Sequence, residues 1–246
     1  MGLSLTIYEQ NLAAGIAALG GSLPRDQRLT PSDLVLSIDS MSRPYPLCLI
    51  LAALYVNASV ALTSVAGEHV DLALATMAVS PTVLVASSHT ISDYHAQHML
   101  PQIGFFAKLG RLMQCSSLDN GVMPQPNFLS RLLTSGPTAE LSLNKLRLLF
   151  ISHRTDTSPQ NQLTSEQLTD LRVFLGTRVV YALTDANVAG AVSQTNAYDY
   201  RREVGPSHFG APLGSVEIKL IDAKDDLQSG NAREGQVCDS LLLGAL

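Results

Sequence analysis

The chain has 246 residues, of which 46% are hydrophobic, 15% are charged and 5% are aromatic, and its formal net charge is −5. This length allows one large domain or two small ones with a substantial core. An acidic chain with no Trp and no basic stripe is not expected to bind nucleic acid. The low charged fraction indicates a well-buried chain, a membrane-associated chain or part of a larger body.

The cysteines lie far apart, at Cys48, Cys115 and Cys238. Their odd number and the lack of a CxxC pair argue against a disulfide framework or a zinc site and favour a reducing compartment. The N-terminus shows no basic region followed by an apolar stretch, so no signal peptide is predicted. We therefore expect a cytoplasmic protein. The letters MGLSLT also fit the N-myristoylation pattern, which is short and often matches by chance.

The N-terminal part of the chain begins with helical and β-rich patterns. A helix is predicted over Leu5–Leu19, ended by Gly20 and Gly21, and a strand over Asp33–Ile38. The segment SMSRPYP that follows is predicted to be irregular because its prolines exclude regular structure.

The segment Leu47–Ala66 carries no charge over 20 residues, which is the length of a membrane-spanning helix. Asn57 in its middle and several Ser and Thr residues argue against a membrane span. We favour a buried helix, a turn at NAS and a strand over VALTSV. Membrane insertion, or peripheral association with a membrane, is the alternative.

Alternating elements continue to the end of the chain. Helices are predicted over Val70–Met77, Ser92–Leu100, Gln102–Met113 and Ser165–Leu175, and strands over Pro81–Ala86, Leu146–Ser152, Arg178–Leu183 and Val216–Asp222. Ser92, and Thr164 or Ser165, are the expected N-caps. We expect an α/β fold with layered sheets and helices. Its parts would be a first subdomain over 1–117, a linker and connecting helix over 118–144, and a second subdomain over 145–246.

Two histidines, His95 and His98, lie three positions apart on a predicted helix, and His89 is near them in the sequence. Such a pair can share a metal ion. No third ligand is fixed by the spacing, so a solvated helix face is the better interpretation.

The segment VVYALTDANVAG (179–190) places a tyrosine, a threonine and an aspartate at the end of an apolar strand. Taken alone, it indicates a strand end with a capped turn. It is, however, one of four segments in a fixed order: KLRLLFISHRTDTSP (145–159), TSEQLTDLRVFLGTRVVYALTDAN (164–187), SHFGAPLGSVEIKLID (207–222) and EGQVCDSLLLGAL (234–246).

This order resembles the adenylate-forming (AMP-binding) superfamily, and within it the long-chain fatty-acyl-CoA ligases. In the first half, GLSLTIYEQNLAAGIAAL, SDLVLSIDSMSRPYP and VSPTVLVASS resemble successive stretches of the same family. The resemblance covers nearly the whole chain. It implies an incomplete version of the family's large N-terminal domain. It also implies a reaction in which ATP and a long-chain carboxylate give acyl-AMP and pyrophosphate before transfer to CoA.

The resemblance assigns roles to the strand end at 181–185. Tyr181 would stack on adenine, Thr184 would bond the α-phosphate, and Asp185 would hold Mg²⁺ where the family has a glutamate. Ala182 replaces a family glycine.

The other turn departs further from the family. Ser152, His153 and Arg154 occupy the positions of a Ser-Gly-Gly turn, whose glycines let the backbone approach adenine. Side chains at 153 and 154 would obstruct that approach or change the backbone. Arg43 falls where a family histidine belongs, on the side of the acyl substrate.

Three parts of the family pattern are expected outside this sequence. They are the phosphate-gripping Gly/Ser/Thr loop before Gly2, the ribose-binding aspartate after Leu246 and the C-terminal domain with the catalytic lysine. We therefore expect no adenylation by this chain alone, and ATP and magnesium as cofactors only if activity remains.

Three hypotheses follow. The chain could be the central part of an acyl-CoA ligase that works with the missing parts. It could be a non-catalytic ligase-like domain that binds a partner, a lipid or another subunit. It could also be a membrane-anchored protein. A protein partner is expected to cover sheet edges and apolar faces that would otherwise be exposed.

Overall fold

The computed structural model describes residues 7–99, 115–118, 121–123, 143, 145–158, 161–218, 220–221 and 236–237. Its helices are α1 (Glu9–Ser22), η1 (Arg25–Gln27), α2 (Pro44–Tyr55), α3 (Leu72–Thr76), α4 (Ser88–Tyr94), the π-helical turn η2 (His95–Met99) and α7 (Ser165–Leu175). Its strands are β1 (Leu34–Ser37), β2 (Ser59–Leu62), β3 (Val83–Ser87), β4 (Leu148–Arg154), β5 (Arg178–Thr184), β6 (Ser193–Gln194), β7 (Ala211–Pro212), β8 (Leu220–Ile221) and β9 (Gln236–Val237).

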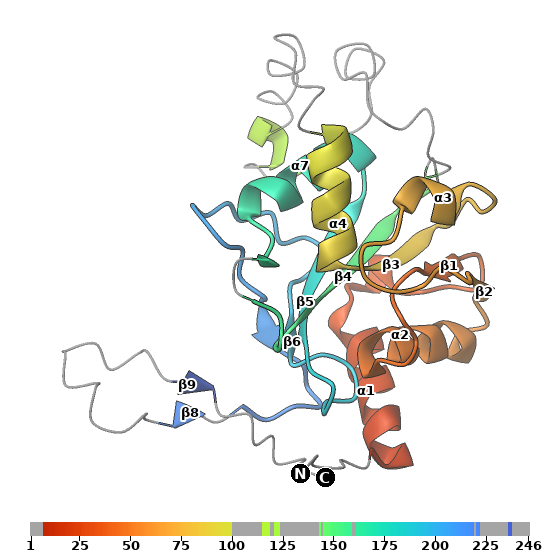
Figure 1. Cartoon of the computed structure of the whole chain (residues 1–246). Helices are drawn as coiled ribbons and strands as arrows, with labels where there is room; N and C mark the ends of the chain where they lie inside the picture. Colours follow the sequence, from red (N-terminus) through yellow and green to blue (C-terminus); the bar gives the residue numbers. More distant parts are fainter. Residues whose placement is uncertain are drawn as a thin grey trace, which may run out of the picture.

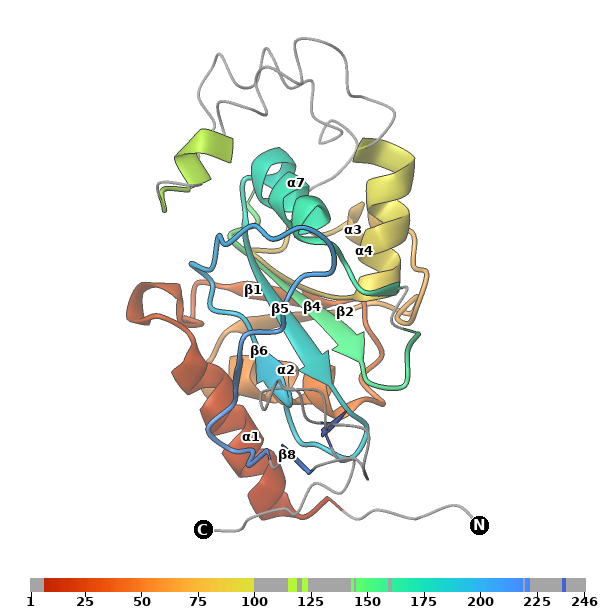
Figure 2. The same cartoon turned by 90° about the vertical axis from the view of Figure 1, so that its left-hand side faces the viewer.

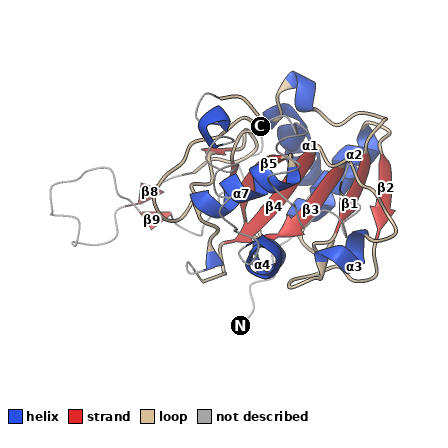
Figure 3. Cartoon of the chain, turned by 90° about the horizontal axis from the view of Figure 1, so that it is seen from above, coloured by secondary structure: helices blue, strands red, loops and turns tan. Residues whose placement is uncertain are grey.

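Seven strands form one mixed sheet in the order β2-β1-β3-β4-β5-β6-β7 (Figures 1 and 3). The first five are parallel and the last two are antiparallel. β8 and β9 form a separate antiparallel pair. The α/β fold predicted from the sequence is therefore confirmed. The sheet also crosses the expected boundary between subdomains, because β3 of the first pairs with β4 of the second.

Helices cover both faces of the sheet (Figures 1 and 2). On one face, α1 and α2 pack on a core that includes Tyr45, Cys48 and Phe150. On the other face, α3, α4 and α7 pack on a core that includes Ile91 and Tyr181. The central strands are buried on both faces, which explains why they lack the alternation of a half-exposed strand.

The start of α2 differs from the prediction for SMSRPYP. Pro44 is the first residue of the helix rather than a barrier to it. The first backbone N–H groups of a helix have no partner within the helix, so proline costs nothing there, and Pro46 lies in the same first turn. The rest of the segment agrees with the prediction: the helix ends at Tyr55, Asn57 has a positive φ of 60°, and β2 follows.

The end of α1 also differs. The helix continues through Gly20 and Gly21 to Ser22. Leu23, which precedes Pro24, is extended, with φ −78° and ψ 137°. Proline disfavours a helical conformation in the residue before it. The stop is therefore set by Pro24 and not by the glycine pair.

Two later predictions need correction. Ser87, and not Ser92, caps α4 by accepting a hydrogen bond from the N–H of Thr90, so the helix begins directly after β3. Among the described residues of the strand predicted over 216–222, residues 216–218 are irregular and Leu220–Ile221 pair with β9. The helix predicted over 102–113 lies outside the described residues, as does most of the predicted linker.

The α7 prediction is confirmed in full. The helix covers Ser165–Leu175. The Thr164 hydroxyl accepts a hydrogen bond from the N–H of Gln167, and the Gln167 side chain accepts one from the N–H of Thr164. Within the ranges that the structure describes, no helix has the length and apolar character needed to cross a membrane.

Candidate functional site

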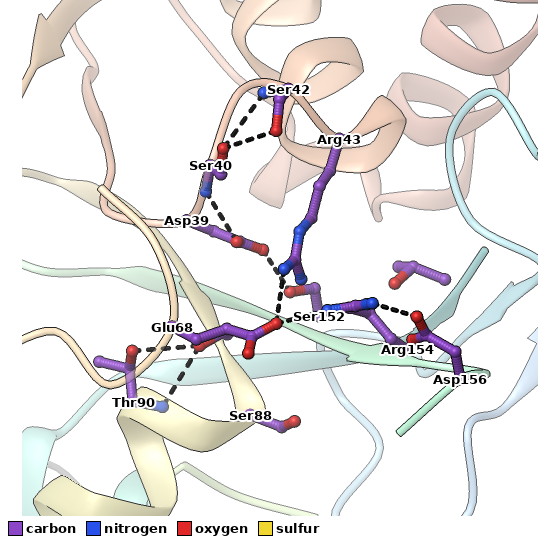
Figure 4. A network of polar contacts seen from close by, with 12 residues as sticks. Asp39, Ser40, Ser42, Arg43, Glu68, Ser88, Thr90, Ser152, Arg154 and Asp156 are labelled. Atoms are coloured by element: carbon purple, nitrogen blue, oxygen red, sulfur yellow. Dashed lines mark hydrogen bonds and ion pairs between the residues drawn. The ribbon is translucent and has the colours of Figure 1, made fainter. Parts of the chain in front are cut away.

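The carboxyl ends of β1, β3, β4 and β5 meet at one edge of the sheet, the place where open α/β sheets commonly bind ligands. β4 and β5 run in register, so Ser152 lies beside Ala182 and Arg154 beside Thr184. The two turns singled out in the sequence are therefore neighbours in space. Arg43 joins them at the N-cap of α2, on the same side of the sheet (Figure 4).

Tyr181 is fully buried near this edge. Its hydroxyl accepts a 3.0 Å hydrogen bond from the N–H of Leu163, and burial raises its pKa above the ordinary value. The ring of Phe209 lies 4.8 Å from that of Tyr181 and 5.3 Å from that of His153, measured between centroids. Tyr181 thus shows no free face in this conformation, and its stacking on adenine remains a prediction that requires Phe209 to move.

Gly210 holds the segment that carries Phe209 close to β6. Its φ is +73°, and a Cβ at this position would lie 2.2 Å from the carbonyl oxygen of Gln194. Any L-residue there would clash with the backbone and be strained. Gly210 therefore lets this segment approach β6 closely enough for Phe209 to contact Tyr181.

His153 is also buried, although a glycine was expected at its position by resemblance. Its Nδ1 lies 3.2 Å from the hydroxyl of Ser88 at the start of α4. Burial lowers the pKa of His153, and the nearby His89 lowers it further. The imidazole is therefore held neutral at physiological pH.

Thr184 and Asp185 have partners within the protein. The hydroxyl of Thr184 donates a 3.1 Å hydrogen bond to the carbonyl of His153. The carboxylate of Asp185 accepts a hydrogen bond from the hydroxyl of Thr155 and a second, of 2.8 Å, from the N–H of Asn187. The β5 end thus hydrogen-bonds to the β4 turn.

These residues do not form a metal site as they stand. Among the described residues there is no group of three His, Cys, Asp or Glu side chains that could hold a metal ion. Asp185 would have to exchange its bond to Thr155 for the cation. Magnesium is usually held by one or two carboxylates together with substrate phosphates. Asp185 could therefore be one ligand of the ion, and the others would have to come from the substrate.

A charged network joins Arg43 to Arg154 (Figure 4). Both guanidinium groups donate to the same carboxylate oxygen of Glu68, each at 2.5 Å, and Arg154 also pairs with Asp156. The pKa of Glu68 is lowered, first by the hydrogen bond from Arg43 and also by Arg154. Glu68 therefore stays ionised and holds the two arginines together.

Asp39 lies beside this network, two residues after the end of β1, and is fully buried. Ser152 donates a 2.5 Å hydrogen bond to it, and the N–H of Ser40 donates another of 2.7 Å. Burial raises the pKa of Asp39, while the bond from Ser152 opposes the increase. Among the residues predicted for the site, Ser152 is thus the one that anchors a buried acid.

Asp39, Glu68 and Phe209 were not singled out in the sequence. A signal existed for Asp39, because a carboxylate at the carboxyl end of a buried parallel strand is placed at the ligand-binding edge. Glu68 and Phe209 lie in irregular segments, where the sequence pattern does not predict which side chain faces the site.

The expectation of a solvated face for His95 and His98 is wrong for His95. His95 is 5% exposed, and its Nε2 lies 2.9 Å from the carboxylate of Asp170 on α7. His98 is partly exposed and packs against the Tyr94 ring at 5.0 Å between centroids. The first histidine thus links η2 to α7 within the core.

No family model matches the sequence, and no curated protein matches it. Solved structures do match. The N-terminal domain of FACL13 from Mycobacterium tuberculosis matches with a TM-score of 0.56 and 8% identity, over 89% of this chain and 42% of that one.

O-succinylbenzoate coenzyme A synthetase from Bacillus subtilis, in complex with AMP, matches with a TM-score of 0.53 and 13% identity. The match covers 96% of this chain and 35% of that one. A benzoate CoA ligase from Burkholderia xenovorans LB400 matches with a TM-score of 0.50 and 16% identity. The match covers 86% of this chain and 33% of that one. The chain spans about a third of the length of these two structures. Identities this low show a shared fold only. The chain therefore has the fold of part of the N-terminal domain of adenylate-forming CoA ligases.

Proposed function

We propose that this chain is an acyl-CoA-ligase-like domain that binds a partner and does not form acyl adenylates by itself. The lack of adenylation is the part that an observation carries: the ring of Phe209 packs against both Tyr181 and His153. By resemblance, adenine would stack on Tyr181. Stacking needs an open aromatic face, and Tyr181 is 0% exposed.

The polar groups that would meet a phosphate or a cation support the same proposal. Arg154 is paired with Glu68 and Asp156, and Asp185 accepts two hydrogen bonds. A nucleotide would have to break these contacts before it gained its own. Exchange of one set of charged hydrogen bonds for another leaves little net free energy for binding.

The alternative is catalysis together with a second polypeptide. The parallel pairing of β4 and β5 favours it, because it keeps Thr184 next to Arg154 at the ligand-binding edge. The partner would then supply the phosphate-gripping loop. By resemblance, the reaction would use ATP, magnesium and a long-chain carboxylate.

Isothermal titration calorimetry with AMP and with MgATP tests the proposal. We expect no saturable heat for the wild type. Phe209→Ala should gain AMP binding because it uncovers Tyr181. Phe174→Ala is the matched control, since it removes another partly buried ring that packs on the same core without opening the corner.

Two results would count against the proposal. Saturable MgATP binding by the wild type, with pyrophosphate release when a fatty acid is added, would show that the chain is an adenylating enzyme. If Phe209→Ala does not bind AMP, the ring of Phe209 is not what blocks the nucleotide.

A further inference from the structure

α1 and α2 lie side by side on one face of the sheet (Figure 1), and a cavity of about 590 Å³ opens between them and the segment after η1. Small-molecule sites in proteins commonly measure ~300–1,000 Å³. No residue of the candidate site at the carboxyl edge lines this cavity. It is a second concave feature, and nothing about it depends on the function proposed above.

The hollow exists because α1 presents small residues on this side. Ala13, Ala17, Gly20 and Gly21 follow at helical spacing and leave the space that larger side chains would fill. Ile16 contributes to an apolar wall on the same helix.

The α2 side of the hollow is also apolar. Val56 and Ala52 line it, and Tyr55 stands at its mouth with 83% of its surface exposed. An exposed tyrosine beside an apolar hollow offers an aromatic face to a ligand and a hydroxyl to water.

Among the described residues that line the groove, Arg28 is the one that carries a charge. It is exposed, and within the described ranges its guanidinium group makes no ion pair or side-chain hydrogen bond. A free guanidinium pairs well with a carboxylate or another anionic head group. Arg28 thus complements the charge that an apolar ligand would carry at one end.

We propose that this groove binds a single-tailed amphiphilic anion. Its head group pairs with Arg28, and its unbranched apolar tail lies between α1 and α2, against Ala17 and Val56. The ligand is a free monomer rather than part of a bilayer, because the groove is concave and carries one cation, not a flat basic face.

The sequence contains no Trp, so Tyr55→Trp introduces a single fluorophore at the mouth of the groove. Titration with hexanoate, octanoate and decanoate below their micelle concentrations should give saturable changes in fluorescence. Affinity should rise about fourfold with each added methylene, as expected for burial of the tail. Decanoate should bind more tightly than decanol. Calorimetry of the wild type with decanoate checks that the fluorophore does not create the site.

Three variants in the Tyr55→Trp background locate the ligand. Ala17→Phe fills the groove and should abolish the response. Ala14→Phe is the matched control, because Ala14 is exposed on the same helix but does not line the groove. Arg28→Gln should keep the dependence on tail length and lose the preference for decanoate over decanol. Circular dichroism confirms that each variant is folded.

The proposal is overturned if decanoate gives no saturable response, if Ala17→Phe binds as well as Ala14→Phe, or if decanol and decanoate bind equally. Co-sedimentation with vesicles of anionic phospholipid, without any response to free decanoate, would also overturn it and would identify a membrane-binding surface instead.

Discussion

Ser152 on β4 donates a 2.5 Å hydrogen bond to the carboxylate of Asp39, which follows β1 and lies 113 positions earlier in the chain. Both residues are buried, at 3% and 0% exposure. Burial raises the pKa of Asp39 and the bond from Ser152 opposes this increase, so the serine offsets part of the cost of burying the acid. The resemblance had assigned this serine to nucleotide binding, and the structure gives it a partner in the protein.

Removal of this donor should destabilise the fold. We expect Ser152→Ala to lower the free energy of unfolding by about 1–3 kcal/mol, because one buried oxygen of Asp39 loses its partner. Urea denaturation at pH 7 measures the change. Ser40→Ala is the control: its hydroxyl bonds only the exposed Ser42, and its N–H still donates to Asp39. Equal effects of the two substitutions would contradict the assigned role.

Asp39 should also make stability depend on pH. Its pKa is raised in the folded state, so the unfolded state ionises first as pH rises above about 4. Stability contributed by the protonated acid is therefore lost with rising pH. Asp39→Asn removes this loss, so the variant should gain stability relative to the wild type between pH 4 and pH 7. Denaturation curves across this range measure it, and a constant difference would exclude Asp39 as the titrating group.

Local signals predicted much of the fold. α7 was predicted with its bounds because an N-cap at Thr164 or Ser165 is a local signal. The structure shows that Thr164 is the cap and that it forms a capping box with Gln167. The start of α2 was missed because proline excludes a helix interior but not a first turn. Ser92 was mistaken for the cap because the helix was predicted to begin there, whereas α4 begins at Ser88 and its cap, Ser87, is the last residue of β3.

The sequence predicted the members of the candidate site that lie at strand ends, but not those from irregular segments. The order of Tyr181, Thr184 and Asp185 placed them at one strand end, and parallel pairing brought them to Arg154. Glu68 and Phe209 come from irregular segments. Their contacts depend on how those segments cross the sheet edge, which neither periodicity nor spacing encodes.

Asp33, which is buried, and Arg147, whose side chain is 28% exposed, form a second link beside the starts of β1 and β4. Arg147 donates to both carboxylate oxygens of Asp33, at 2.8 and 2.7 Å. Asp33→Asn should cost about 1.5–3 kcal/mol, because Arg147 loses its hydrogen bonds to a charged partner. Asp93→Asn, which removes the partner of His69 in an exposed pair, should cost less than about 1 kcal/mol. Equal costs in urea denaturation would contradict this ranking.

The same carboxylate should contribute to acid denaturation. Burial alone would raise the pKa of Asp33, but hydrogen bonds from Arg147, the Thr30 backbone and Thr82 outweigh it and lower the pKa to about 2. The contribution of Asp33 to stability is therefore present above the ordinary aspartate pKa and lost as pH falls from about 4 to about 2. Thermal unfolding between pH 2 and pH 5 should show a shallower decline for Asp33→Asn than for the wild type. Parallel curves would refute the assignment.

Two glycines of α1 should respond in opposite ways to alanine. A Cβ at Gly15 would lie 2.5 Å from the carbonyl oxygen of Ala189, so Gly15→Ala must push α1 away from the loop between β5 and β6. Such overpacking costs about 1–3 kcal/mol. A Cβ at Gly21 would meet no neighbouring atom within 4 Å, and Gly21→Ala should add about 0.5–1 kcal/mol by restricting the unfolded chain and favouring the helix. Urea denaturation of both variants tests the packing of α1, and a Gly15→Ala protein as stable as the wild type would show that the helix does not approach this loop so closely.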